Sequence, residues 1–329
     1  MCGIVGYIGK KQAFPIIING LKRLEYRGYD SAGIALLSSS GELNIYKKKG
    51  KVVNLEEAAA GSDISGNVGI GHTRWATHGE ANDLNAHPHF NATEDLAVIH
   101  NGIIENYYSL KTELQTRGYV FRSETDTEVL VHLIEEIKKN VDCSLEEAVR
   151  LALNEVIGAY AIVVISKNDP DKLITAKLSS PLVIGFGDNE MFVASDGSPL
   201  IEHTKKVSYL EDGQMAVLHA SGEVNVKSIK DNKTHVPYID ELQLKLEQIE
   251  KGGFDHFMMK EIHEQPQAIK NSIRGRIDSQ QFWVNLGGVR EHETRFKNAN
   301  KITIVACGTS WHSALIGEYL IEDLARINV

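Results

Sequence analysis

The start of this chain constrains its fold more than any other segment, because a cysteine directly precedes a strand-like sequence. Residues 3–9 read Gly-Ile-Val-Gly-Tyr-Ile-Gly, and their β-branched and aromatic side chains are typical of a β-strand. Cys2 is therefore expected to be held by a sheet edge, where strand pairing prevents the fraying that is usual at a chain end. The fold has to pair this first strand and fix the position of the cysteine.

The position of Cys2 also indicates a chemistry. Removal of Met1 by an aminopeptidase, which a residue as small as cysteine permits, would leave a thiol and a free α-amino group on one residue. A free α-amine has a pKa of about 7.7 to 8.0 and a thiol one of about 8.5, so the amine can accept the thiol proton near neutral pH. The resulting thiolate is the nucleophilic form. The alternative interpretation is an ordinary buried cysteine.

Composition narrows the class of protein. The chain has 329 residues, which is enough for one large or two ordinary domains. Its net charge of −9 argues against a nucleic-acid partner. No apolar run reaches the length of a membrane span, and the start does not resemble a signal peptide. Three scattered cysteines, Cys2, Cys143 and Cys307, do not form a disulfide framework and indicate a reducing, cytoplasmic compartment.

The first 229 residues alternate short β-rich runs with a few amphipathic helices. Helical spacing relates Phe14, Ile17, Leu21 and Leu24. The patterns Thr125-x-x-Glu128 and Ser144-x-x-Glu147 resemble capping boxes that begin two further helices. Strands are expected at residues 32–37, 160–165, 173–178, 182–186, 191–194, 215–219 and 224–229. Sheets with helices grouped apart from them predict an α+β layered domain.

A polar stretch at residues 230–238 indicates a domain boundary. We expect a first domain over residues 2–230, a linker and helical segment over 231–300, and a third segment over 301–329. In the last segment, residues 302–306 are predicted to form a buried parallel strand, followed by a helix at about 311–325. Such a βα unit opens an α/β sheet, but one unit cannot cover both faces of a parallel sheet. The second domain is therefore expected to be incomplete within this chain.

Residues 71–79, Gly-His-Thr-Arg-Trp-Ala-Thr-His-Gly, are predicted to form a polar loop between two strands. Arg74 offers a planar fork of donors suited to a carboxylate, although a purely structural arginine is the alternative. Four histidines lie close together in this part of the sequence, namely His72, His78, His87 and His89. Because they lack familiar ligand spacing with a cysteine or carboxylate, no metal site is predicted.

Three further polar motifs carry candidate chemistry. His100-Asn101-Gly102 follows an apolar run and is expected at the end of a buried strand, where an Asn amide and a Gly N–H can form an oxyanion hole. The alternative is an Asn-Gly turn. Asp126 is either a partner of a helix dipole or an anchor for an ammonium group. The segment 307–310, Cys-Gly-Thr-Ser, is suited to a phosphate at a helix N-terminus.

Together these motifs resemble the glutamine:fructose-6-phosphate amidotransferase family, also called glucosamine-6-phosphate synthases. Residues 1–9, 25–33, 71–79, 100–102 and 125–126 match its glutaminase half in order and spacing. The similarity continues to the start of the sugar-phosphate isomerase half at residues 307–310. Other amidotransferases that begin with Cys-Gly do not usually carry the Arg-Trp-Ala-Thr-His-Gly motif or the Cys-Gly-Thr-Ser segment.

The resemblance implies a fold and a reaction. The fold is a four-layer αββα sandwich of the N-terminal-nucleophile amidohydrolase type, followed by the truncated first part of an α/β sugar-phosphate isomerase domain. Glutamine is the ammonia donor and no cofactor is implied. The complete enzyme converts fructose 6-phosphate to glucosamine 6-phosphate in amino sugar biosynthesis (the hexosamine pathway), as a homodimer without a nucleic-acid or membrane partner. This chain alone is expected to be a glutaminase rather than a synthase.

The resemblance also implies roles for individual residues. Cys2 attacks the glutamine amide, its own α-amine shuttles the proton, and Asn101 and Gly102 hold the oxyanion. Arg74 binds the α-carboxylate of glutamine and Asp126 its α-ammonium group. The remaining implied roles belong to Thr77 and His78, which line the glutamine pocket, Trp75, which gates the ammonia route, and Thr309 and Ser310, which begin the sugar-phosphate site.

Two alternatives remain open at this point. One is another amidotransferase of the same nucleophile type with a different acceptor. The other is a noncatalytic module that binds glutamine in the same pocket. The segment 307–310 and the Arg74 motif argue against the first alternative, and the removal of Met1 separates a catalytic chain from the second.

Overall fold

The computed structural model describes residues 2–76, 78–242, 253–273, 276–278, 283–284 and 292–329. The chain divides into two compact units, Met1–Glu250 and Lys251–Val329. Over the described residues, none of the helices has both the length and the apolar composition needed to cross a lipid bilayer.

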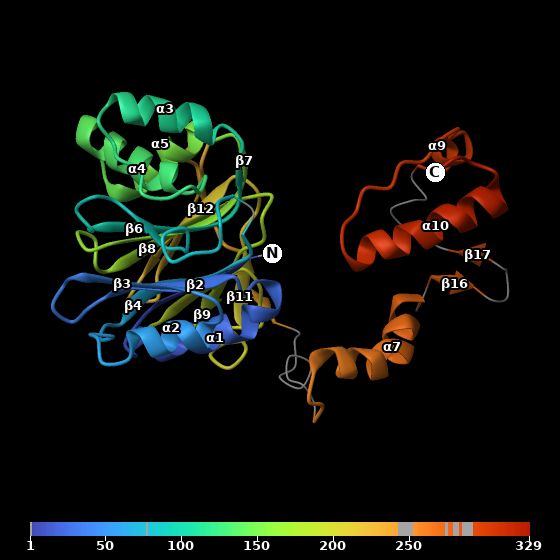
Figure 1. The fold of residues 1–329 in the computed structure, drawn as a ribbon, viewed down its shortest axis with the longest axis horizontal. Helices are drawn as coiled ribbons and strands as arrows, with labels where there is room; N and C mark the ends of the chain where they lie inside the picture. Colours follow the sequence, from blue (N-terminus) through green and yellow to red (C-terminus); the bar gives the residue numbers. More distant parts are fainter. Residues whose placement is uncertain (1, 77, 243–252, 274–275, 279–282, 285–291) are drawn as a thin grey trace. The chain divides into compact units, whose positions relative to one another are not determined.

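Two antiparallel sheets form the centre of the first unit (Figure 1). The larger sheet has eight strands in the order β15 (Asp240–Glu241), β11 (Lys206–Tyr209), β9 (Val183–Phe186), β10 (Met191–Ala194), β1 (Gly3–Ile8), β4 (Val68–Arg74), β2 (Ser31–Leu37) and β3 (Leu43–Lys49). The smaller sheet has seven strands in the order β14 (Thr234–His235), β13 (Val224–Ser228), β12 (Gln214–His219), β8 (Lys172–Leu178), β7 (Gly158–Ser166), β6 (Leu96–Ile104) and β5 (His89–Phe90). The first strand thus lies inside a sheet, paired on both sides.

Helices cover the outer face of each sheet, which gives four layers (Figure 1). The eight-stranded sheet carries α1 (Ala13–Leu24) and α2 (Val52–Ala59), and the seven-stranded sheet carries α3 (Tyr107–Thr116), α4 (Glu128–Asn140) and α5 (Leu145–Glu155). The predicted αββα arrangement is therefore confirmed. The expected strands and the helix carrying Phe14 and Leu21 are confirmed as well.

Alternation of side chains along β1 explains why the chain forms two cores around this sheet. Ile4 and Ile8 face the seven-stranded sheet and belong to the core between the sheets, whereas Val5 and Tyr7 face α1 and belong to the core on the other side. All four are essentially inaccessible to solvent. Full burial of such side chains stabilises the fold by about 1.5–3 kcal/mol each, so both faces of this strand hold the N-terminus in place.

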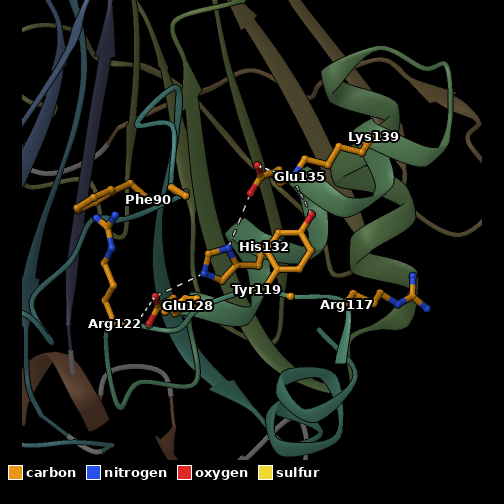
Figure 2. A pocket seen from close by; sticks show the side chains of 11 residues that line it. Phe90, Arg117, Tyr119, Arg122, Glu128, His132, Glu135 and Lys139 are labelled. Carbon is orange, nitrogen blue, oxygen red and sulfur yellow. Dashed lines mark hydrogen bonds and ion pairs between the residues drawn. The ribbon is translucent and has the colours of Figure 1, made fainter. Parts of the chain in front are cut away.

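Helix α4 begins two residues later than the capping box predicted. Thr125 does not cap the helix, because its hydroxyl bonds to His89 Nε2 at 3.0 Å and the N-cap position is Thr127. Glu128 accepts hydrogen bonds from the backbone N–H groups of Arg122 and Ser123 rather than from a cap. Figure 2 shows the His132 ring between Glu128 and a second carboxylate farther along the helix. The cap predicted at Ser144 is confirmed, since its hydroxyl accepts the N–H of Glu147.

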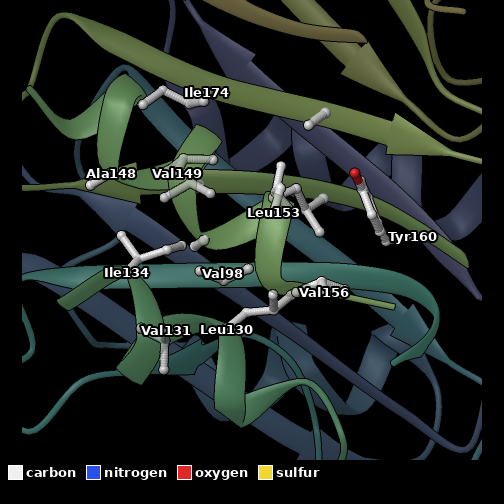
Figure 3. Packing of buried hydrophobic residues seen from close by; sticks show 14 of the residues in the cluster. Val98, Leu130, Val131, Ile134, Ala148, Val149, Leu153, Val156, Tyr160 and Ile174 are labelled. Atoms are coloured by element: carbon white, nitrogen blue, oxygen red, sulfur yellow. The ribbon is translucent and has the colours of Figure 1, made fainter. Parts of the chain in front are cut away.

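A third core joins α4 and α5 to the outer face of the seven-stranded sheet (Figure 3). The helices contribute Leu130, Ile134, Val149 and Leu153, which pack against Val98 of β6 and further sheet residues. The face of α4 that carries Leu130 and Ile134 is therefore a buried face. This packing holds the residues just before α4 against the end of β6.

The first unit extends beyond the boundary expected at residue 230. Strands β14 and β15 add to the outer edges of the two sheets, and Leu242 is buried in the core under α1. The polar composition of residues 230–238 therefore marks solvent-facing edge strands rather than a linker. Edge strands rich in charged residues avoid pairing with other chains.

The second unit contains α7 (Phe257–Ile273), the short strands β16 (Ile277–Asp278) and β17 (Trp283–Val284), α9 (Glu293–Lys297) and α10 (Thr309–Ala325). Helix α10 confirms the predicted helix, but the parallel strand predicted at residues 302–306 is wrong. The described residues there are not a strand, and Val305 is 91% exposed. A buried parallel strand needs neighbours along its whole length, whereas this segment is flanked only by a bridge between Lys301 and Asn328 in the described part of the unit.

Candidate active site

Cys2 lies directly before β1, and its thiol contacts the loop that follows β4. Its Sγ accepts a hydrogen bond from the N–H of Trp75 at 3.2 Å and lies 3.6 Å from the Trp75 carbonyl oxygen. Burial raises the pKa of the Cys2 thiol, while the Trp75 N–H, the charge of the chain's amino terminus and the charge of Arg74 act against that rise. A thiol with a raised pKa is protonated near neutrality and needs a base to become a nucleophile.

The predicted polar loop at residues 71–79 is in part a strand. Strand β4 continues to Arg74, so the loop starts only at Trp75. Because side chains alternate along a strand, His72 and Arg74 lie on the same face as Val68 and Ile70, which belong to the core between the sheets. Ile4 of β1 faces the same space. The sheet therefore directs Cys2, His72 and Arg74 toward the same inner end of the sandwich.

Arg74 is buried, and its guanidinium donates hydrogen bonds to three consecutive backbone carbonyls, those of His78, Gly79 and Glu80. Burial lowers the pKa of Arg74, and the nearby charges of Cys2, Asp126 and Asp30 oppose that shift. Arg74 thus fixes the loop that follows β4 and adds a positive charge near Cys2. Its contact with a substrate carboxylate stays a prediction.

Asn101 and Gly102 lie inside β6, not at the end of a strand and not in a turn as the sequence suggested. Both residues are paired with β7. Asn101 Nδ2 donates to the carbonyl oxygen of Cys2 at 3.0 Å. Gly102 has a φ of 136°, and a Cβ at this position would lie 1.9 Å from the carbonyl oxygen of Ala159. Only glycine fits there.

Asp126 lies one residue before the N-cap of α4 instead of in the first turn of the helix. Its Oδ2 accepts the backbone N–H of Ile104 at 2.8 Å, and the side chain is buried. This bond ties the approach to α4 to the end of β6, close to Asn101. The electrostatic effect of Asp126 on Arg74 places both groups in one region.

Trp75 is the exposed part of the region, with 48% of its surface accessible, and its ring meets Tyr29 edge-on at 6.2 Å. The neighbouring Ala76 N–H donates to Asp30 Oδ2 at 2.8 Å, and Asp30 N–H donates to the Arg74 carbonyl at 3.0 Å. Asp30 belongs to the run at 25–33, but no role was predicted for it from the sequence. The segment after the short helix η1 (Glu25–Arg27) therefore shapes the loop beside Cys2.

The other predicted site residues are spread over the chain. His78 is half-buried, and its ring lies 5.8 Å from that of Tyr107. Thr77 lies outside the described residues. Thr309 and Ser310 occupy the first turn of α10 in the second unit and are exposed.

Four buried histidines lie behind the site, and only three of them belong to the set that the sequence singled out. The rings of His72 and His87 are 4.1 Å apart, and those of His87 and His89 are 4.7 Å apart. His100 joins them, because Thr127 Oγ1 bonds to both His87 Nε2 and His100 Nδ1 at 3.0 and 2.9 Å. Burial lowers the pKa of each ring. Over the described part of the chain, no cluster of His, Cys, Asp or Glu is arranged to hold a metal ion.

Comparison with known proteins identifies the family. The model of the family described as "Glutamine amidotransferase domain" matches residues 56–225. The chain is 56% identical over 329 residues to a Bacteroides thetaiotaomicron protein named glutamine--fructose-6-phosphate aminotransferase [isomerizing], covering 100% of this chain and 53% of that protein. A Chlorobaculum tepidum protein of the same name is 56% identical over 333 residues, covering 100% of this chain and 54% of that protein. The chain thus spans about half the length of the curated relatives that it matches.

A solved structure supports the same assignment. The glutamine phosphoribosylpyrophosphate amidotransferase from B. subtilis, complexed with ADP and GMP, superimposes with a TM-score of 0.60 at 28% identity, covering 70% of this chain and 50% of that one. The match accounts for the layered first unit. The motifs indicated a similarity to glutamine:fructose-6-phosphate amidotransferases, and this similarity extends over the whole chain. The chain belongs to the glutamine amidotransferase domain family.

Proposed function

We propose that this chain hydrolyses the side-chain amide of glutamine, with Cys2 as the nucleophile once Met1 has been removed. The observation that carries the proposal is the convergence of a thiol, an amide donor and a cation. Asn101 Nδ2 donates to the Cys2 carbonyl, and Arg74 acts electrostatically on the Cys2 thiol. Hydrolysis of the side-chain amide of an amino acid that carries an α-carboxylate uses these three kinds of group.

The proposed reaction uses these groups together with the α-amine of Cys2. The α-amine of Cys2 accepts the thiol proton, and the thiolate forms a C–S bond to the glutamine side-chain carbonyl carbon. The carbonyl oxygen becomes an oxyanion, which Asn101 Nδ2–H and the Gly102 N–H stabilise. The α-ammonium returns its proton to the departing nitrogen, so the C–N bond breaks and ammonia leaves. Water then cleaves the thioester, releasing glutamate and regenerating the thiol.

Arg74 and Asp126 supply the charges that a zwitterionic amino acid requires. A guanidinium has five N–H donors, and three hydrogen bonds of Arg74 go to the carbonyls of residues 78–80. Two N–H groups have no partner among the described residues and are free to bind the substrate carboxylate. One oxygen of the buried Asp126 carboxylate accepts the Ile104 N–H, which leaves the other for the α-ammonium group. Thr77 and His78 complete the pocket in this proposal.

The acceptor follows by similarity alone. Relatives that match this chain over its full length are named for fructose 6-phosphate, so we assign that sugar phosphate as the acceptor in the complete protein, with glucosamine 6-phosphate as the product. Thr309 and Ser310 would begin the sugar-phosphate site, because N–H groups at the start of α10 suit an anion. Trp75 would gate the passage of ammonia, as its ring is half-exposed and its backbone N–H contacts Cys2 Sγ. The homodimer stays a prediction.

A glutaminase assay on this chain tests the proposal. Cys2→Ala should abolish glutamate release, whereas the matched thiol variant Cys143→Ala should leave it nearly intact. A covalent analogue of glutamine should add mass to the N-terminal peptide alone, with Met1 missing from that peptide. Equal labelling of Cys143, or binding of glutamine without any glutamate release from a chain that has lost Met1, would reject the assignment.

Asn101→Ala tests the oxyanion role separately. The variant should lower kcat by about 10² to 10³ with little change in KM, because the hydrogen bond from the Asn101 side chain to the oxyanion exists only in the transition state. An effect confined to KM would make Asn101 a substrate contact.

A further inference from the structure

His72 makes a hydrogen bond to Asn101 that no role assigned so far explains. Its Nε2 lies 2.9 Å from Asn101 Oδ1 and 3.0 Å from the carbonyl oxygen of His100. A backbone carbonyl can only accept a hydrogen bond, so Nε2 carries the ring proton and donates. His72 is fully buried between the two sheets.

The same reasoning fixes the orientation of the Asn101 amide. One end of the amide faces the carbonyl oxygen of Cys2 at 3.0 Å, and an acceptor there requires the NH₂ group. The other end is therefore the oxygen, and it faces the Nε2–H of His72. If the amide rotated by half a turn, an NH₂ group would meet the N–H of His72 and an oxygen would meet the Cys2 carbonyl. Both contacts would be repulsive, so the two partners select one orientation.

We propose that His72 is a positioning residue for amide hydrolysis, whose Nε2–H holds the Asn101 side chain with Nδ2 facing the Cys2 end of the site. The inference rests on the proposed glutaminase function and assigns a residue that acts on the reaction through Asn101. His72 has no contact with the Cys2 thiol in the described structure. It projects from the opposite sheet to Asn101, and the bond between them joins β4 to β6.

The histidines behind His72 keep its ring in place. The ring of His87 packs against it with 4.1 Å between ring centres, and Thr127 links His87 to His100, whose own carbonyl accepts from His72. These contacts form a closed ring from His72 through His87, Thr127 and His100 back to His72, and Thr127 is the residue next to Asp126. Burial lowers the pKa of His72 to about 3, so the ring stays neutral over the working pH range. The donor is therefore present at every pH at which Cys2 can react.

The competing explanation is that His72 is a buried histidine with a purely structural role. The two nitrogen atoms of the ring allow the positioning role and the structural role to be distinguished. Nδ1 of His72 has no hydrogen-bond partner in the described structure. Only the Nε2 side of the ring therefore makes a hydrogen bond, which packing alone would not require. A replacement that keeps a donor near the Nε2 position should preserve the function, whereas one that keeps polarity near Nδ1 should not.

The test compares His72→Gln with His72→Asn in the glutaminase assay of the full chain. The glutamine amide reaches about as far as Nε2, while the asparagine amide ends near Nδ1 and cannot reach Asn101. His72→Asn should lower kcat by about tenfold with KM for glutamine unchanged, and His72→Gln should recover most of the loss. His203→Leu changes a half-buried histidine stacked on Phe192, and it should leave kcat unchanged, which controls for loss of a histidine as such.

A double-mutant cycle decides the outcome, because residues that act through one another are not additive. In an Asn101→Ala background, His72→Asn should change kcat by less than about twofold. The same tenfold loss in both backgrounds, an effect on KM alone, or equal activity of the Gln and Asn variants would overturn the inference. Failure of the proposed function itself would look different, since the unmodified chain would then release no glutamate or Asn101→Ala would have no effect.

Discussion

Replacing Gly102 by alanine tests how far the backbone of β6 is constrained at the site. Two separate penalties act at this position, the positive φ of 136° and the approach of a Cβ to 1.9 Å from the Ala159 carbonyl oxygen. A non-glycine residue at positive φ costs about 1–2 kcal/mol, and overpacking costs about 1–3 kcal/mol. We therefore expect Gly102→Ala to lower the free energy of unfolding by about 2–5 kcal/mol.

The chain offers controls that separate these two penalties. Gly118 has a φ of 92° with no atom within 4 Å of a Cβ, so Gly118→Ala measures the backbone cost alone. At Gly33, which is not at positive φ, a Cβ would lie 2.0 Å from the His87 carbonyl oxygen, so Gly33→Ala measures the clash alone. Gly66 combines both, with a φ of 117° and a Cβ 1.9 Å from the Leu37 carbonyl oxygen, outside the candidate site.

Urea unfolding followed by circular dichroism gives the change for each variant, provided the slope of the transition is constant. Gly102→Ala and Gly66→Ala should lose similar stability, and more than Gly118→Ala. Only Gly102→Ala should also lower kcat of the folded fraction, because its N–H is an oxyanion donor in the proposed mechanism. If Gly102→Ala is no less stable than Gly118→Ala, the clash with Ala159 does not exist and the reasoning is wrong.

Three further results are expected. Arg74→Ala or Asp126→Asn should raise KM for glutamine roughly 10- to 100-fold with a smaller effect on kcat. Each variant removes a charged hydrogen bond worth about 1.5–3 kcal/mol from ground and transition states alike. An unchanged KM in steady-state kinetics would contradict the substrate contact. Burial disfavours the ionised form of Glu128, yet the His132 side chain and the N–H and O–H groups of residues 122–123 outweigh it and lower its pKa to about 2. The stability that Glu128 contributes is therefore complete above its unfolded pKa of about 4.3 and lost as the pH falls toward 2, so Glu128→Gln should flatten the pH dependence of unfolding in that window, and a dependence equal to that of the unmodified chain would show that Glu128 is not responsible. Ser144→Ala should lower the free energy of unfolding in urea by about 1 kcal/mol, because the hydroxyl that caps the N–H of Glu147 is lost. A change below a few tenths of a kcal/mol would show that the cap does not stabilise the helix.

The sequence predicted the elements whose pattern is local. The β-branched and aromatic side chains of residues 3–9 identified β1, and the spacing of Phe14 and Leu21 identified α1, because the fold buries the side chains that form each pattern. The cap at Ser144 was predictable for the same reason, since its partner lies three residues away. These features need no knowledge of distant segments.

The failures arose where a distant partner decides the structure. Thr125 has the right spacing for a capping box, but His89 takes its hydroxyl. Asn101-Gly102 has the composition of a turn, but pairing with β7 keeps it in a strand. Residues 302–306 are as apolar as a buried strand, yet the described residues of the second unit do not surround them with neighbours. In the site, Cys2 and Arg74 were predicted, whereas the supporting Asp30 and His72 act through contacts that no short motif encodes.

The candidate site is divided between the two sheets, with Cys2 and Arg74 on the eight-stranded sheet and Asn101 on the seven-stranded one. The core between the sheets therefore works as a spacer that sets the gap between the attacking sulfur and the oxyanion donor. Small residues such as Ala97 and Ala161 keep this spacer thin. Enlarging either side chain would press on the facing sheet, and the reaction is sensitive to such a shift, since reacting atoms have to approach within about 3–3.5 Å. Selection on the interior of this domain is then selection on reaction geometry as much as on stability.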